Sequence, residues 1–316
     1  MSAGATGERD LEDTGGGDGS GDTVLGTLPI TFAIVGVQKG ATSMIDLLLS
    51  YHRQVAAKRV PAQDGPSWYG SNKELHFFDD EALDWDHPDY RTYARLQTKP
   101  HHKIAGDSTP SYLFWPHALE RMHAYDARMR LVASFRDPVE RAFSQWCMGR
   151  SRPRPFPPFS ECLERYDDAS LLDRIPDSMG RWEPHRASMV VRGLYGAQLR
   201  RGLDIYPREQ WLLLSFDDFI ADYQAVLDRL TDHLGVHRYR RYPLLPHNPT
   251  PPVAAGAAPT AEELERLAHR YADDLAEFER LSGIDVSAWP TRRITDGSMD
   301  AAELAEKFSR KIVASA

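Results

Sequence analysis

The stretch Ile30–Leu49 constrains the fold of this chain more than any other. Its first part, Ile30–Gly36, is a short run of apolar, β-branched and aromatic residues, which is typical of a strand buried on both faces. A turn containing Gly40 follows, and the apolar run from Met44 begins a helix with hydroxyl residues near its N-terminus. Such a strand, turn and helix start form a site for anions, because backbone N–H groups and the positive end of the helix dipole converge there.

Lys39 distinguishes this turn from the Walker sequence of nucleotide-binding proteins. The Walker lysine follows the second glycine, whereas Lys39 precedes Gly40 and lies shortly after Gly36. Thr42 and Ser43 add two hydroxyl groups next to the lysine. The pattern predicts a phosphate-type loop, and a tight strand-to-helix turn with a surface lysine is the alternative.

Length and charge limit the classes of function. The 316 residues, of which 27% are charged, fit one large α/β domain with additions and a sizeable core. A net charge of −8 argues against a general nucleic-acid binder but permits a local basic cleft. No run approaches the ~18 consecutive apolar residues of a membrane span, and the N-terminus lacks a basic region followed by an apolar one. We therefore expect a soluble, cytoplasmic protein without a nucleic-acid or membrane partner.

Composition divides the chain into three parts. Residues 1–28 are rich in Gly, Asp, Glu, Ser and Thr, which predicts a disordered acidic tail. Residues 29–290 alternate β-type apolar runs with amphipathic helical patterns and form the main domain. Residues 291–316 form a C-terminal extension, which we expect to be helical and packed on the body rather than on a partner.

The alternation predicts an α/β fold with a mostly parallel central sheet flanked by helices. The expected strands are Ile30–Gly36, a short one near Lys103–Ala105, Arg130–Phe135 and Gln210–Phe216. The expected helices are Tyr112–Tyr125, Pro138–Arg150, Ser188–Tyr206 and Asp222–Leu234. The ligand of such a fold lies beyond the C-terminal ends of the strands, where the turn with Lys39 stands.

Two segments interrupt this alternation. Ser151–Phe159 is too rich in proline for a helix, so we expect an excursion over the surface. Pro246–Pro259 reads as a second flexible loop, and the cap-like Thr260 after it begins a helix.

A second informative stretch is the strand that ends next to Arg136. Asp137 and the proline after it suit the cap and first-turn positions of a new helix. Because parallel strands end at the same rim, Arg136 is expected near Lys39, where a guanidinium fork suits a second phosphate. Pairing of Arg136 with Asp137 or Glu140 is the alternative.

Together, the two stretches resemble the sulfotransferases that use 3′-phosphoadenosine 5′-phosphosulfate (PAPS). Gly36–Ser43 matches their 5′-phosphosulfate loop, and Arg136–Ser144 matches their 3′-phosphate motif. The chain looks most like the branch containing heparan sulfate sulfotransferases and many bacterial relatives. The segments that support this are Lys73–Asp79, Ser108–Tyr112, Gly193–Leu199 and Tyr206–Gln210. The resemblance spans about Ile30 to Pro290 and implies the P-loop-like fold of that family.

The resemblance also implies roles for individual residues. Those that match the 5′-phosphosulfate loop are Lys39, Gly40, Ala41, Thr42 and Ser43. Arg136 and Ser144 match the ligands of the 3′-phosphate. Glu74 matches the general base of the family, and His76 is either a second base or a hydrogen-bonded support for Glu74.

The implied reaction transfers a sulfuryl group from PAPS to a hydroxyl, or secondarily an amine, of a glycan or secondary metabolite, leaving adenosine 3′,5′-bisphosphate. It needs an in-line acceptor, a base for the acceptor proton and a cation on the leaving phosphate. Lys39 can supply that cation, and no His, Cys or carboxylate cluster has metal-ligand spacing along the sequence, so we expect no metal requirement. A nucleotide-dependent kinase of related fold and a non-catalytic nucleotide-binding protein are the alternatives. The sequence leaves the acceptor and the oligomeric state open.

Two departures from the family concern cations. Ser108 stands where members of the glycan branch often carry a lysine, and Pro246–Pro259 contains no Lys or Arg where the family often has a basic loop over the cofactor. Arg192 either compensates as a cofactor ligand or is a surface arginine at a helix N-terminus.

Aromatic residues around the expected base have two possible uses. Phe77 and Phe78 are expected in the core rather than against a ligand. The residues that either line an acceptor cleft or serve packing are Trp68, Tyr69, Trp115, Trp182 and His185.

Overall fold

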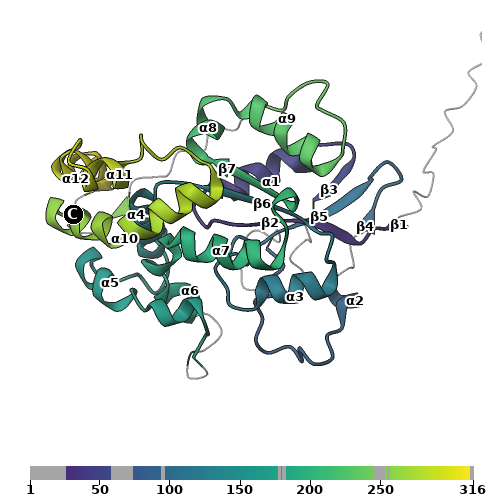
Figure 1. Cartoon of the computed structure of the whole chain (residues 1–316), viewed down its shortest axis with the longest axis horizontal. Coiled ribbons are helices and arrows are strands. Elements are labelled where there is room, and N and C mark those ends of the chain that lie inside the picture. The colour runs from purple at the N-terminus through teal and green to yellow at the C-terminus, as the bar shows by residue number, and fades with distance from the viewer. Residues whose placement is uncertain are drawn as a thin grey trace, which may run out of the picture.

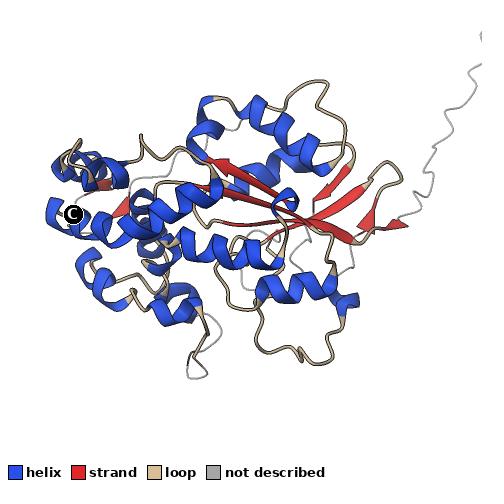
Figure 2. Ribbon diagram, viewed as in Figure 1, coloured by secondary structure: helices blue, strands red, loops and turns tan. Residues whose placement is uncertain are grey.

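The computed structural model of the chain describes residues 26–57, 74–93, 97–176, 179, 183–244, 253–254 and 257–313. At its centre lies a five-stranded sheet with helices on both faces (Figure 1; Figure 2). In spatial order, its strands are β3 (Val55–Ala57), β5 (Ile104–Ser108), β2 (Ile30–Gly36), β6 (Arg130–Phe135) and β7 (Trp211–Ser215). Every neighbouring pair is parallel, which confirms the predicted mostly parallel sheet.

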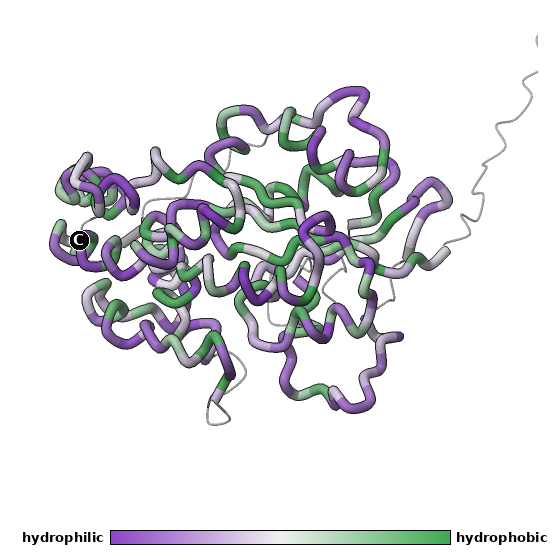
Figure 3. The backbone as a smooth tube through the Cα atoms, in the orientation of Figure 1, coloured by the Kyte–Doolittle hydropathy of each residue, from purple (hydrophilic) through white to green (hydrophobic). Residues whose placement is uncertain are grey.

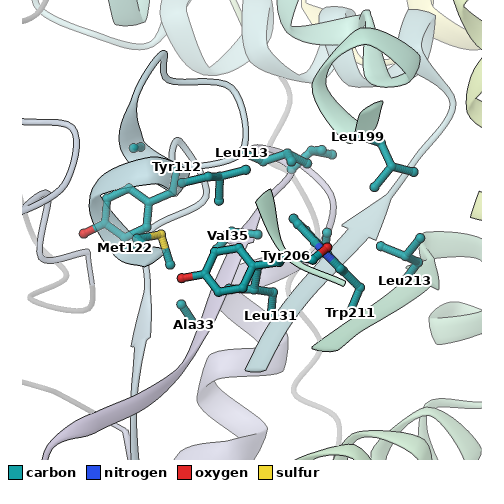
Figure 4. Packing of buried hydrophobic residues seen from close by; sticks show 14 of the residues in the cluster. Ala33, Val35, Tyr112, Leu113, Met122, Leu131, Leu199, Tyr206, Trp211 and Leu213 are labelled. Atoms are coloured by element: carbon teal, nitrogen blue, oxygen red, sulfur yellow. The ribbon is translucent and has the colours of Figure 1, made fainter. Parts of the chain in front are cut away.

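The two faces of the sheet belong to separate hydrophobic clusters. On one face, Phe32 and Ile34 pack with α1 (Thr42–Ser50), α8 (Phe216–Ala221) and α9 (Tyr223–Leu234). On the other face, Ala33 and Val35 pack with α3 (Ala118–Tyr125), α7 (Tyr195–Ile205) and α10 (Ala261–Ser282). Figure 4 shows part of this second cluster, with Tyr112 and Met122 beside the sheet. β2 is therefore apolar along its length because helices cover both of its faces.

The C-terminal ends of the strands meet at one rim of the sheet. Ile34 of β2 lies opposite Ser108 of β5, and Phe135 of β6 lies opposite Ser215 of β7. The turn that follows β2 and the residue that follows β6 consequently share this rim, which is where ligands bind in open parallel sheets.

Two of the expected helices differ from those in the structure, whereas α4 (Pro138–Arg150) has the expected bounds. The expected helix from Tyr112 begins only at Ala118, because Pro116 cannot donate within a helix and interrupts the preceding turns. The expected helix from Ser188 is divided into η3 (Val191–Gly193) and α7. At Gly193 a Cβ atom would lie 2.5 Å from the Tyr271 ring, so this close contact requires glycine.

Strand β5 extends further than its apolar residues indicated. It continues past Ala105 through Gly106 and Asp107 to Ser108, and these last three residues are uncharacteristic of strands. Gly106 is required there because a Cβ atom would lie 2.0 Å from the ring of Phe32. Asp107 and Ser108 are buried polar residues at the functional rim, which explains why hydrophobicity did not reveal them.

A third hydrophobic cluster joins α4 to helices beside the sheet. These helices are α5 (Phe159–Arg165), α6 (Glu183–Ala187), α11 (Pro290–Thr295) and α12 (Ala301–Ser309). Figure 3 shows hydrophobic residues concentrated along the central strands and hydrophilic residues on outer parts of the helices. In the C-terminal extension, Leu304 and Phe308 of α12 are buried in this core. Helix α10 begins with the anticipated capping box at Thr260.

The remaining described elements are short. They are α2 (Tyr90–Tyr93), η2 (Ala169–Leu172), η4 (Arg208–Gln210), an antiparallel pair of β1 (Gly26–Thr27) with β4 (Gln97–Thr98), and a parallel pair of β8 (Val253–Ala254) with β9 (Ile312–Val313). Gly26 and Thr27, which composition placed in the acidic tail, thus form a strand; residues 1–25 lie outside the described residues. Among the described helices, none is long and apolar enough to cross a bilayer.

Candidate active site

The loop between β2 and α1 is shaped for close approach to the sheet. The amide of Val37 donates to the Ser134 carbonyl oxygen at 3.0 Å, which holds the loop against the end of β6. A Cβ atom on Gly40 would lie 2.1 Å from that same oxygen, so only glycine fits. Lys39 and Ala41 have φ angles of 74° and 69°, in the left-handed region that non-glycine residues rarely adopt.

Ala41 is also the N-cap of α1 and cannot accept from the first N–H groups of the helix through its side chain. Thr42 and Ser43 follow in the first turn. The start of α1 therefore presents backbone donors and hydroxyl groups together with the positive end of the helix dipole, a combination that fits a phosphate or phosphosulfate group.

Lys39 lies in a region of positive charge. It is half-buried rather than a fully exposed surface lysine. Burial lowers its pKa, and the nearby positive charges of Arg136, Arg152 and Arg141 lower it further. An anion bound between these groups would relieve their repulsion.

Arg136 follows β6 on the same rim, as expected. Its Nε and Nη2 donate to Oε2 of Glu140 at 3.1 and 2.8 Å, so the predicted alternative, an ion pair with Glu140, is present. The guanidinium also lies 4.7 Å from the centre of the Phe216 ring. These bonds use one side of the fork, and Ser144 lies one helical turn beyond Glu140 on the same side of α4.

Glu74, His76 and Asp79 form a hydrogen-bonded cluster beside the residues that follow β5. His76 Nε2 lies 3.3 Å from a Glu74 oxygen, and its Nδ1 lies 2.9 Å from Asp79 Oδ2. Ser111 donates a further hydrogen bond to Asp79. Burial opposes the charge on His76, but Asp79 and Glu74 outweigh it and raise the pKa of His76 to about 10. His76 is therefore an imidazolium near neutral pH, which suits a support for Glu74 better than a base.

The segment carrying Glu74 is held by residues that follow β5. The amide of Leu75 donates to Thr109 Oγ1 at 3.0 Å, and the amide of Phe77 donates to the Tyr112 hydroxyl at 3.1 Å. Two segments that the sequence singled out separately are therefore one structural unit. Phe77 and Phe78 are buried in the core, as expected.

His185 and Arg192 complete the cluster and were not connected with Glu74 by the sequence. Arg192 donates to His185 Nδ1 at 3.1 Å and to Ser188 Oγ at 2.6 Å. Burial and the Arg192 charge lower the pKa of His185 to about 3, so His185 is neutral. Arg192 is almost completely buried, and of its two alternatives the surface arginine is wrong, because Ser188 and His185 accept from its guanidinium in the interior. Its role as a cofactor ligand stays a prediction.

Three of these side chains approach the spacing of a metal site, since ligand atoms of His76, Asp79 and His185 all lie within 4.8 Å of one another. The hydrogen bonds oppose that use. Arg192 can only donate, so Nδ1 of His185 must accept and its Nε2, the atom 4.0 Å from Asp79, carries the proton. Nδ1 of His76 lies 2.9 Å from Asp79 Oδ2, so these two groups are already hydrogen-bonded to each other.

A cavity of about 1300 Å³ joins the loop after β2 to this cluster. Gln38, Glu74, His76 and His185 line it. Its outer wall carries four arginines, Arg152, Arg154, Arg165 and Arg186. The proline-rich segment after α4, expected to cross the surface, thus forms one wall of the cavity, because Phe156 is buried and anchors it.

The other candidate cleft residues have different positions. Trp115 is buried and stacks on His185, with ring centres 4.8 Å apart. It therefore serves as a packing residue that holds the His185 ring in place. Trp68, Tyr69 and Trp182 lie outside the described residues, as does Lys73. Ser108, where a lysine was anticipated, is buried at the end of β5.

Comparison with known proteins agrees with this geometry. A profile described as the sulfotransferase family matches residues 29–240. The human heparan sulfate glucosamine 3-O-sulfotransferase 3A1 is 29% identical over 241 residues, which cover 71% of this chain and 52% of the human protein. Human heparan sulfate glucosamine 3-O-sulfotransferase 6 is also 29% identical, over 208 residues covering 65% of this chain and 52% of that protein. The chain thus spans about half the length of these curated relatives.

A solved structure extends the similarity over most of the fold. The crystal structure of a sulfotransferase from Alicyclobacillus acidocaldarius superposes with a TM-score of 0.62 at 26% identity, covering 83% of this chain and 99% of that one. The family profile matches more than half of the chain and includes both the loop with Lys39 and the helix with Ser144. The chain therefore belongs to the sulfotransferase family.

Proposed function

We propose that this protein is a PAPS-dependent sulfotransferase that modifies a hydroxyl, or secondarily an amine, of a glycan or small secondary metabolite. The observation that carries the proposal is that a single cavity is lined by Gln38 of the anion loop and by Glu74 of the carboxylate–imidazolium cluster. A donor anion held at the loop and an acceptor held near Glu74 would meet in that cavity. Such a meeting of donor, acceptor and base is what an in-line group transfer requires.

Each residue has a defined task in this proposal. PAPS, when bound, supplies the sulfuryl group, and the start of α1 with Thr42 and Ser43 holds its 5′ side. Glu74 takes the proton of the acceptor hydroxyl as the new S–O bond forms. Lys39 places its charge where the leaving phosphate oxygen becomes anionic as the old S–O bond breaks. His76, hydrogen-bonded to both Glu74 and Asp79, fixes the position of the Glu74 carboxylate.

Adenosine 3′,5′-bisphosphate is expected to bind much better than ADP or ATP. Arg136 and Ser144 would contact the 3′-phosphate, which ADP and ATP lack, and one charge-assisted contact contributes on the order of 1.5–3 kcal/mol. Titration calorimetry with the three nucleotides measures the difference. Equal affinity for ATP would contradict the proposal and favour a kinase.

The arginines of the cavity wall favour an acidic acceptor. We expect Arg154→Ala to raise the KM for an acceptor bearing carboxylate or sulfate groups by roughly 10-fold, a change equivalent to one lost charge-assisted contact. The KM for a neutral acceptor should change little. Arg128→Ala is the matched control, because Arg128 is exposed and lies before the N-terminal end of β6, opposite the cavity rim. A neutral acceptor affected equally would show that the wall does not select for charge.

The imidazolium of His76 should make stability depend on pH. Because its pKa is raised from 6.5 to about 10, its stabilising bonds are fully present below pH 6.5 and are lost as the pH rises through 10. His76→Gln should therefore lower the free energy of unfolding by about 1–3 kcal/mol at pH 6, and the difference from the parent protein should shrink by pH 10. Urea unfolding at pH 6, 8 and 10 measures this; a difference independent of pH would mean that His76 is neutral.

A further inference from the structure

The C-terminal extension places a lysine on the carboxylate that pairs with Arg136. Lys307 of α12 places its Nζ 2.5 Å from Oε1 of Glu140, and the other oxygen of Glu140 accepts from Arg136. Burial opposes the charge on Glu140, yet Arg136 and Lys307 hold its pKa below the ordinary value. One carboxylate therefore joins a cation of the C-terminal extension to the arginine of the 3′-phosphate motif.

The position of α12 is fixed by packing on α4. The rings of Phe308 and Phe143 are stacked, with centres 3.8 Å apart and planes 4° apart. Phe143 directly precedes Ser144, so this contact holds the extension beside the helix that carries the expected phosphate ligand. The strand after α12, β9, pairs with β8, which lies within the loop Pro246–Pro259 that contains no Lys or Arg. The pairing of β8 with β9 thus joins the loop to the C-terminal extension.

Lys311 follows the C-terminal end of α12, and its amide donates to the Phe308 carbonyl oxygen at 3.0 Å. Burial, and then the positive charge of Arg136, lower the pKa of Lys311. Phe308 packs on Phe143 of α4, so the end of α12 and Lys311 after it lie beside the part of α4 that carries Ser144.

We propose that Lys307 and Lys311 belong to the cofactor site and bind the 3′-phosphate of PAPS together with Arg136. This inference rests on the proposed function and names ligands that the matched family region, which ends at residue 240, does not contain. A phosphate monoester carries a charge of about −1.5 to −2 near neutral pH. Arg136 alone cannot balance that charge while it is paired with Glu140. Arg136, Lys307 and Lys311 together would balance both Glu140 and the phosphate.

The test compares two nucleotides that differ only in the 3′-phosphate. Titration calorimetry with adenosine 3′,5′-bisphosphate and with AMP would be run on Lys307→Ala, Lys311→Ala and the double variant. We expect each single variant to bind the bisphosphate about 10-fold more weakly and the double variant about 100-fold more weakly, while AMP affinity changes less than about twofold. Arg310→Ala is the matched control, because Arg310 is exposed and paired with Glu306. It should change neither affinity.

The outcomes separate this inference from the function on which it rests. A parent protein that binds the bisphosphate no better than AMP contradicts the proposed function itself. A parent protein that prefers the bisphosphate, with a double variant that keeps the same preference, overturns only the assignment of Lys307 and Lys311. An equal loss for both nucleotides also overturns it, and thermal unfolding of each variant identifies a loss caused by misfolding. Lys307→Arg keeps the charge and should retain most of the preference.

Discussion

Glu74→Gln is expected to lower turnover about 10²–10⁴-fold while leaving the affinity for adenosine 3′,5′-bisphosphate nearly unchanged. The substitution keeps the shape of the side chain and removes its ability to take a proton. Glu74 lies outside the anion loop, so binding of the donor side should persist. Steady-state turnover and product calorimetry on the same preparation measure the two quantities.

Glu183→Gln is the matched control for Glu74→Gln, because Glu183 lines the same cavity but is exposed on α6. It should retain activity within a few-fold. His76→Ala should lower turnover less than Glu74→Gln, because the imidazolium supports the base and does not replace it. If only the histidine variant were inactive, the base would be His76, and an acidic acceptor such as a phenol, with a pKa near 10, would become the favoured substrate.

Lys39→Ala should lower turnover about 10²–10³-fold, and it should weaken binding of the bisphosphate product much less. The lysine charge matters most when the leaving oxygen becomes anionic, so its loss affects the transition state more than the bound state. The comparison of kcat with the product dissociation constant separates the two effects.

Lys103→Ala controls for the loss of one lysine, since Lys103 is exposed before the N-terminal end of β5, opposite the rim that carries Lys39. This variant should behave like the parent protein. Unchanged turnover of a folded Lys39→Ala variant would mean that Lys39 has no catalytic role and that the loop only connects β2 to α1.

Local sequence patterns predicted the sheet because its strands are buried on both faces. β2, β6 and α4 have the predicted bounds, since apolar runs and the cap at Asp137 are short-range signals. Only the first part of β5 was predicted, because its last residues are polar and lie at the rim where the site is formed. Pairing of Arg136 with Glu140 was one of two alternatives, and it follows from their spacing along α4.

The contacts made by distant segments could not be predicted in the same way. Nothing local to His185 indicates that it faces Asp79 or that Arg192 fixes its tautomer, because these contacts arise only when α6 and η3 pack beside the base segment. The lysines of α12 likewise reach Glu140 only through tertiary packing. Such contacts between residues far apart in the sequence depend on the whole fold rather than on local sequence patterns.

The anchoring of the base segment has a consequence for how acceptor range can change. Glu74 is positioned from its C-terminal side, by the bonds from Leu75 to Thr109 and from Phe77 to Tyr112. A substitution at Thr109 or Tyr112 that removes one of these bonds can therefore shift the carboxylate without touching it. Engineered changes of the acceptor range should accordingly keep Thr109 and Tyr112, so that the Glu74 carboxylate retains its place.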